Sequence, residues 1–383
     1  MFSRRTAWDL AANSFAGRLE AARAAGRPLL DLAETNPTRV GLAWPHAQLA
    51  AALAAGDVGR HDPEPRGAPS ARAAVAAYLA GRGHQASPDR ILLTASTSEA
   101  YALLLKLLCD PGDEVLVPAP AYPLLDLLAE LEAVRLVRYP LRYDGTWSID
   151  LPALAAAVGP RTRAVVVVSP ANPVGAVLSD DELRALDRLC ADRDLALISD
   201  EVFAESAQGP LASALDAREG LAFHLSGLSK LCGLPQLKVA WLAAAGPAGR
   251  VAPALARLEV IADAYLSVSG PAQQALAPLL AAREAFLAPL RARLAENARA
   301  LSQVSDPPFS VLRGAGGWAA VLQVGQRWNE EALAVDLLEE GVVVQPGFFF
   351  DFERSGHLVL SLLPEPGVFT EGLSRVTGTL RAG

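Results

Sequence analysis

Short apolar runs alternate with helix-like segments through the middle of the chain, and this alternation limits the possible folds more than any other feature. The six runs are Ile91–Ala95, Glu114–Val117, Ala164–Val168, Leu195–Ser199, Ala222–Ser226 and Val239–Ala243. Their length and composition are typical of strands buried on both faces of a parallel sheet. Between two of them, Ser179-Asp180-Asp181-Glu182 has the pattern of a capping box that begins a helix. The repeated order of strand and helix predicts an α/β fold with a doubly wound, mostly parallel sheet.

The last hundred residues have a different pattern. With 383 residues, the chain is too long for one typical core, so two domains are expected. Charged helical stretches over 282–301 and 330–340 alternate with short apolar runs at 342–345 and 358–362. We therefore expect a large domain over residues 46–275 and a smaller α+β domain that contains residues 276–383.

Charge and cysteine content exclude several classes of protein. A net charge of −8 argues against binding to nucleic acid and to an anionic membrane surface. No apolar stretch reaches the roughly 18 residues that a spanning helix needs. The three cysteines, Cys109, Cys190 and Cys232, have neither the even number of a disulfide framework nor a zinc spacing. We therefore predict no metal site, no nucleic-acid or membrane partner, and a reducing, cytoplasmic location.

Three polar landmarks follow the predicted strands. Ser96 and Asp200 come directly after two of the apolar runs, and Lys230 lies four residues beyond a third, in Ser226-Gly227-Leu228-Ser229-Lys230. Ligands of doubly wound sheets bind at the carboxyl ends of the strands, so these side chains are expected to meet in one crevice. Lysine is also the side chain that forms Schiff bases with carbonyl cofactors.

The order and spacing of the motifs resemble a known family. Pro170-Ala171-Asn172-Pro173-Val174-Gly175, Ser199-Asp200-Glu201-Val202-Phe203 and the Lys230 segment follow one another, with 28 residues from Asn172 to Asp200 and 30 from Asp200 to Lys230. Together they resemble the class I/II aminotransferases, which are pyridoxal-phosphate enzymes of fold type I. The resemblance runs from about residue 28 to 375. It implies that residues 1–45 join the small domain and that the protein is a homodimer.

The resemblance also implies a role for each site residue. Lys230 would form the Schiff base with pyridoxal phosphate and carry the proton, and Asp200 would face the ring nitrogen and keep it protonated. Asn172 would donate a hydrogen bond to the phenolic oxygen. The remaining cofactor contacts implied are Ser96, Thr97, Ser98 and Lys238 for the phosphate and Tyr122 for stacking on the ring. From the residues alone, Tyr122 could instead be a core aromatic residue, and Asp200 taken by itself reads as a helix N-cap.

Four positions depart from the family pattern. Phe203 replaces a tyrosine, His61 replaces a tyrosine that reaches the partner subunit, and Gly227 replaces a frequent serine. Val359 stands where most relatives have the arginine that binds the substrate carboxylate, and valine cannot make that contact. Arg39 and Arg354 are the candidates to replace that arginine, although solvated surface arginines would explain them as well. Asn36, in Thr35-Asn36-Pro37, matches a loop that lines the substrate side in relatives, and an Asx turn would explain it nearly as well.

The sequence therefore predicts a pyridoxal-phosphate-dependent aminotransferase with a ping-pong cycle. It would move an amino group between an amino acid or amine and a 2-oxo acid through Lys230. Two alternatives stay open: a pyridoxal-phosphate lyase or cyclase acting on an amino acid, and a non-catalytic relative that only binds the cofactor. The sequence does not name the donor or the acceptor.

Overall fold

A large sheet forms the centre of the molecule. The computed structural model describes residues 1–11, 13–42, 44–57, 59, 61–304 and 309–382. Within these residues the sheet has eight strands, which in spatial order are β2 (Ile91–Thr94), β9 (Ala240–Ala245), β8 (Leu221–Gly227), β7 (Ala196–Asp200), β6 (Thr162–Val168), β3 (Glu114–Ala119), β4 (Arg135–Tyr143) and β5 (Trp147–Ile149). The pairs from β8 through β7, β6 and β3 to β4 are parallel, while β9 and β5 run antiparallel to their neighbours. The predicted α/β, mostly parallel sheet is confirmed.

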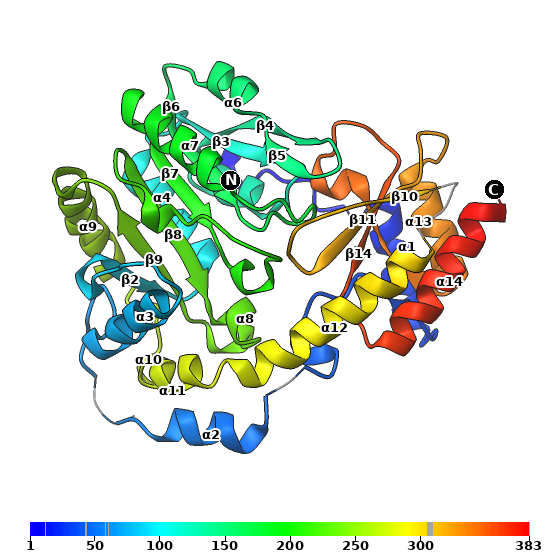
Figure 1. The fold of residues 1–383 in the computed structure, drawn as a ribbon, viewed down its shortest axis with the longest axis horizontal. Helices are drawn as coiled ribbons and strands as arrows, with labels where there is room; N and C mark the ends of the chain where they lie inside the picture. Colours follow the sequence, from blue (N-terminus) through cyan, green and yellow to red (C-terminus); the bar gives the residue numbers. More distant parts are fainter. Residues whose placement is uncertain (12, 43, 58, 60, 305–308, 383) are drawn as a thin grey trace.

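Helices cover both faces of this sheet (Figure 1). One face packs against α4 (Thr97–Leu108), α5 (Leu124–Leu131) and α9 (Ala248–Asp263). The other face packs against α3 (Pro69–Gly81), α6 (Leu151–Ala157) and α7 (Asp180–Asp192). At the start of α7 the capping box is present, because the Ser179 hydroxyl and the Glu182 carboxylate each accept the other's backbone N–H.

A second, smaller unit lies to the right in Figure 1. Its antiparallel sheet has the order β10 (Ser310–Leu312), β11 (Ala319–Gln323), β14 (His357–Ser361) and β13 (Gln345–Pro346), and β1 (Leu30–Asp31) pairs in parallel with β12 (Val342–Val343). The helices beside these strands are α1 (Ser14–Ala24), α13 (Glu330–Glu339) and α14 (Pro366–Ala382). The pairing of β1 with β12 brings the N-terminal segment onto this unit.

One long helix connects the two units. In Figure 1, α12 (Glu284–Gln303) runs from beside α11 (Leu276–Ala281) to the small sheet. The short helices α10 (Gly270–Gln274) and α2 (His46–Ala54) pack beside α11, and α8 (Leu228–Leu231) follows β8. None of the helices in the described part of the chain is long and apolar enough to cross a membrane.

All six strands predicted for the large sheet are present, with ends that differ by at most two residues. Two further strands, β4 and β5, were not predicted. Strand β4 has the sequence Arg-Leu-Val-Arg-Tyr-Pro-Leu-Arg-Tyr, and its charged residues interrupt the apolar run that marks the inner strands. It lies next to the edge strand β5, where charged side chains can reach solvent.

Candidate functional site

The carboxyl ends of three parallel strands bring the main site residues together. Asp200 is the last residue of β7, and Lys230 lies in α8, directly after β8. Asn172 follows β6, and the backbone N–H of Ser169, three residues earlier, donates to the Asp200 carbonyl oxygen at 2.9 Å. The sequence prediction of one crevice at this edge therefore agrees with the positions of these residues.

The amine of Lys230 lies against two aromatic rings. Its Nζ is 4.8 Å from the ring centroid of Trp318 and 5.6 Å from that of Phe203. Among the described residues, no hydrogen bond or ion pair reaches this amine. Burial lowers the pKa of Lys230 to about 8, although the negative charge of Asp200 acts in the opposite direction. A fraction of the amine is therefore neutral near physiological pH, as nucleophilic attack on a carbonyl requires.

Asp200 is a buried carboxylate with an unusual acidity. Burial raises its pKa to about 6, against the opposing effects of the Val202 N–H, the Tyr101 hydroxyl and His224. One carboxylate oxygen accepts the Val202 N–H at 3.2 Å. The Tyr101 hydroxyl is buried and has no hydrogen-bond partner at normal distance among the described residues. A buried carboxylate with spare hydrogen-bonding capacity is suited to bind a cationic ring nitrogen.

A second buried pair lies on the opposite face of the sheet, behind Asp200. Nδ1 of His224 on β8 is 3.1 Å from Oε2 of Glu201, and both side chains are almost fully buried. The other Glu201 oxygen accepts from the Ser213 hydroxyl at 3.1 Å and the Ala214 N–H at 2.9 Å. Burial alone would raise the pKa of Glu201, but His224 and these two donors hold it below its usual value. The pair fixes the backbone that follows Asp200.

The first turn of α4 provides backbone donors close to this edge. Ser96 is the N-cap, and its hydroxyl accepts the Glu99 N–H at 3.1 Å. Its oxygen is therefore engaged in capping. The amides of Thr97 and Ser98 have no acceptor inside the helix, as is usual for the first turn. Free amides at a helix N-terminus are suited to a phosphate.

Lys238 is placed to add a positive charge to these amides. It immediately precedes Val239 and β9, in a left-handed backbone conformation with φ of 53°. Thr94 of β2 pairs with Ala240 of β9, so the register extended outward brings Ser96 towards Lys238. The predicted phosphate ligands therefore come from adjacent strand ends.

Asn172 and Tyr122, the other two predicted cofactor ligands, differ in their surroundings. Asn172 is half-buried in a tight turn closed by the Gly175 N–H and the Ala171 carbonyl at 2.6 Å, and its side chain has no partner among the described residues. Tyr122 follows β3 and is 51% exposed, with its ring centroid 6.4 Å from that of Phe350. Its stacking role stays a prediction.

The three predicted substrate ligands lie in different places. Arg39 is 72% exposed and 3.6 Å from Glu34, and Asn36 caps a short turn through the Thr38 N–H. The Leu32 carbonyl, a few residues before them, accepts the Ser361 N–H at the end of β14 that adjoins Trp318. Arg354 precedes the other end of β14, roughly 15 Å of strand away. Arg39 is therefore the better placed arginine, and both roles stay predictions.

Val359 lies in the middle of β14 and is 1% exposed. It pairs with Val321 and Gln345 and packs in one apolar cluster with Phe350 and Val174. Apolar packing, and not a cation, therefore occupies the position where the family pattern has an arginine.

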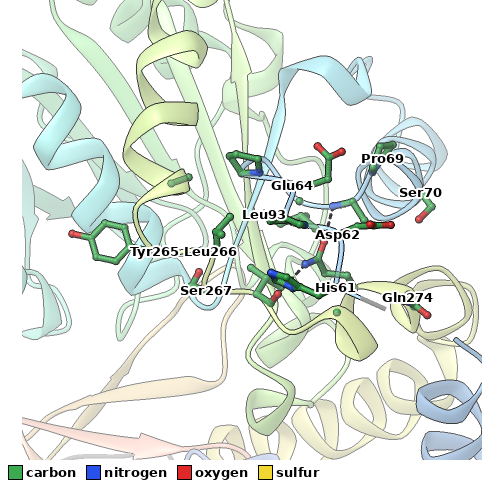
Figure 2. Close-up of a pocket in the computed structure, with 18 of the residues that line it drawn as sticks. His61, Asp62, Glu64, Pro69, Ser70, Leu93, Tyr265, Leu266, Ser267 and Gln274 are labelled. Atoms are coloured by element: carbon green, nitrogen blue, oxygen red, sulfur yellow. Dashed lines mark hydrogen bonds between the residues drawn. The ribbon is translucent and has the colours of Figure 1, made fainter. Parts of the chain in front are cut away.

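A separate pocket of 460 Å³ adjoins the first turn of α4 (Figure 2). It is lined by His61, Glu64, Glu99, Ser267 and Gln274, among others, and Tyr265 and Leu266 lie at its rim. The Ser267 hydroxyl donates to Glu99 at 2.7 Å. The pocket therefore borders the helix that begins with the proposed phosphate ligands.

Sequence reasoning missed Tyr101, Trp318 and the partner His224 of Glu201. Trp318 follows two glycines in the sequence, and its position next to Lys230 depends on how the small sheet docks. Tyr101 lies five residues after Ser96, one turn into α4, where the pattern alone indicates a core aromatic residue. No local signal distinguishes these residues from core.

Comparison with known proteins agrees with the fold. The family described as aminotransferase class I and II matches residues 27–366. The chain therefore belongs to the class I and II aminotransferases, which are pyridoxal-phosphate-dependent enzymes.

The individual relatives are named for different substrates. The glutamate–pyruvate aminotransferase AlaA of Escherichia coli K12 is 27% identical over 317 residues, which are 78% of this chain and 77% of the relative. A probable N-succinyldiaminopimelate aminotransferase DapC of Mycobacterium tuberculosis is 34% identical over 267 residues, covering 67% and 65%. The solved alanine aminotransferase of Pyrococcus furiosus has a TM-score of 0.91 at 21% identity, covers 100% of both chains, and shows the fold alone.

Proposed function

We propose that this aminotransferase binds pyridoxal phosphate through Lys230 and moves an amino group from an amino acid or amine to a 2-oxo acid in a ping-pong cycle. The observation that carries the proposal is the buried Lys230 amine, which lacks a described partner and lies at the same sheet edge as the buried carboxylate of Asp200. Relatives named for glutamate and pyruvate favour an amino acid as donor and a 2-oxo acid as acceptor.

The residues present fit the cofactor. Lys230 would hold its carbonyl carbon, Asp200 its ring nitrogen and Asn172 its phenolic oxygen. The free amides of Thr97 and Ser98, together with Lys238, would hold its phosphate. When bound, pyridoxal phosphate withdraws the electrons released as a substrate bond breaks.

The side chains of this protein then supply binding and proton transfer. Asp200 keeps the ring nitrogen protonated through its negative charge, an electrostatic effect often worth several kcal/mol. With the substrate bound, Nζ of Lys230 would act as the base that takes the proton from the substrate carbon and as the acid that returns it. Phe203 and Trp318 limit the access of water to that nitrogen. We also propose a homodimer in which the His61 pocket faces the second subunit.

The chain offers a clean test, because it contains only three lysines: Lys106, Lys230 and Lys238. Borohydride reduction of the cofactor-loaded protein, followed by peptide mapping, should leave a phosphopyridoxyl group on Lys230. A Lys230→Ala variant should lose both the adduct and the production of oxo acid from an amino-donor panel, whereas Lys106→Ala, the matched control, should retain both. An adduct on Lys106 or Lys238 in the wild-type protein, or none at all, would contradict the proposal.

A further inference from the structure

Two segments, one from the small unit and one from the large unit, meet beside Lys230. One is the turn at Gly314–Gly317, which precedes Trp318 and β11. The other is the short helix η4 (Ala204–Ser206), which follows Phe203. A methyl group added to Gly316 would lie 2.6 Å from Cγ of Pro170 and 3.0 Å from Cα of Ala207. The two segments therefore touch at backbone distance, and glycine permits this contact.

A single hydroxyl bridges the two segments. Oγ of Ser206 donates to the Phe203 carbonyl at 2.6 Å and accepts the Gly317 N–H at 2.9 Å. The Gln208 N–H donates to the Ala315 carbonyl at 2.7 Å, which closes the contact from the other side. Ser206 is thus bonded to one residue adjacent to Trp318 and to Phe203 itself.

The neighbouring Glu205 anchors η4 to two helices. Its Oε1 accepts the Tyr78 hydroxyl of α3 at 2.9 Å and lies 3.5 Å from Nε of Arg82. Its Oε2 is 3.1 Å from a guanidinium nitrogen of Arg291 on α12, the helix that connects the two sheets. The side chain of Glu205 is 17% exposed, so these contacts are screened less than those of a surface ion pair.

These contacts fix the geometry of the rings around the amine. Phe203 and Trp318 meet edge to face, with centroids 5.3 Å apart. We propose that Ser206 and Glu205 are positioning residues, which hold Phe203 and Trp318 together over the Lys230 amine and exclude water from it. Asp200 is the charged side chain that acts on this amine among the described residues, and the two rings lie against it.

The direction of the effect follows from the burial of the amine. Burial is the main reason that the pKa of Lys230 falls to about 8. Loosening the ring pair admits water and moves the pKa of Lys230 back towards its ordinary value of 10.5. A rise of one unit would lower the neutral fraction of the amine at pH 7.5 about eightfold. Loss of the ring–cation contact acts in the opposite direction and would make the rise smaller.

The inference rests on the proposed role of Lys230, but its test does not need the cofactor. Acetic anhydride labelling of the cofactor-free protein across a pH series, with peptide mass spectrometry, gives the pKa of Lys230, and Lys106 provides an internal reference. The variants are Ser206→Ala, Ser206→Thr and Glu205→Gln. The matched control is Glu284→Gln, because Glu284 also pairs with Arg291, at 2.8 Å, but makes no described contact with η4.

We expect the pKa of Lys230 to rise by about one unit, or tenfold in proton affinity, in Ser206→Ala, and to rise in Glu205→Gln. It should stay at the wild-type value in Ser206→Thr, which keeps the hydroxyl, and in Glu284→Gln. An unchanged pKa in Ser206→Ala would overturn the inference, as would equal shifts in Ser206→Ala and Ser206→Thr. An equal shift in Glu205→Gln and Glu284→Gln would remove Glu205 from it.

Two further readouts complete the test. Thermal unfolding of each variant checks the fold, and Ser206→Ala decides the matter if Glu205→Gln does not fold. Borohydride mapping separates this outcome from the proposed function. An adduct on Lys230 with unshifted variant pKa values rejects the positioning role alone, whereas shifted pKa values without an adduct reject the cofactor role alone.

Discussion

Replacing Asp200 by asparagine should stabilise the cofactor-free protein, because the native site holds a buried carboxylate without a bound cation. Burial raises the pKa of Asp200 from 3.8 to about 6. The folded protein therefore binds this proton more tightly than the unfolded chain does. For a carboxyl group with a raised folded-state pKa, stability falls as the pH rises from 3.8 through 6 and stays low above that range.

The magnitude follows from the size of the shift. A difference of roughly two units corresponds to about 3 kcal/mol, since one unit is worth 1.36 kcal/mol. Asparagine carries no charge and still presents an oxygen to the Val202 N–H, so it escapes this cost. Asp200→Asn should therefore exceed the wild-type protein in stability by about 1.5 kcal/mol at pH 5 and by about 3 kcal/mol at pH 8.

Urea unfolding of both cofactor-free proteins at pH 5, 6, 7 and 8 measures this difference. The variant Asp263→Asn, on the exposed C-terminal turn of α9, controls for the loss of one negative charge from a chain of net charge −8. A difference that does not grow between pH 5 and pH 8, or a less stable Asp200→Asn, would show that Asp200 is not desolvated in the native state. The same variant should lose most of its transamination activity.

Two further changes test the surroundings of the site. In the cofactor-loaded protein, Phe203→Tyr should lower the pKa of the imine that Lys230 forms with the cofactor, because the new hydroxyl donates towards the phenolic oxygen. This pKa is read from the visible absorbance. An equal or higher value in the variant would place Phe203 away from that oxygen. Arg39→Ala should raise the KM of an active α-amino acid about tenfold, or ~1.4 kcal/mol, while Arg354→Ala, at the far end of β14, should leave it unchanged. A KM that Arg39→Ala does not alter would exclude Arg39 as a carboxylate ligand.

The parts of the fold that the sequence predicted are those with a local cause. Inner strands such as Ala164–Val168 must be apolar on both faces, so their pattern is visible in the sequence. Polar residues that follow such strands lie at one sheet edge, which is why Asp200 and Lys230 could be predicted together. The capping box at Ser179 depends on neighbours three residues apart, and it is present for the same reason.

The missed features depend on contacts between distant segments. Trp318 meets Phe203 only because the glycine turn of the small unit docks on η4. Tyr101 belongs to α4 but lies near Asp200 at the end of β7, and His224 pairs with Glu201 from the adjacent strand. In each case the residue type is compatible with ordinary core packing, so periodicity alone does not separate the two roles.

The acidities of Asp200 and Lys230 together define a pH range for cofactor capture. When the pH is below the Asp200 pKa of about 6, Asp200 is protonated and no longer attracts a cationic ring nitrogen. When the pH is above the Lys230 pKa of about 8, the amine is largely neutral, whereas at lower pH protonation reduces its nucleophilic fraction. Protonation of Asp200 therefore limits cofactor binding below pH 6, and between pH 6 and pH 8 only a fraction of the Lys230 amine is nucleophilic. The rate at which the cofactor attaches to Lys230 should therefore increase from pH 6 to pH 8. Because the rings of Phe203 and Trp318 help to lower the pKa of this amine, attachment becomes possible near neutral pH.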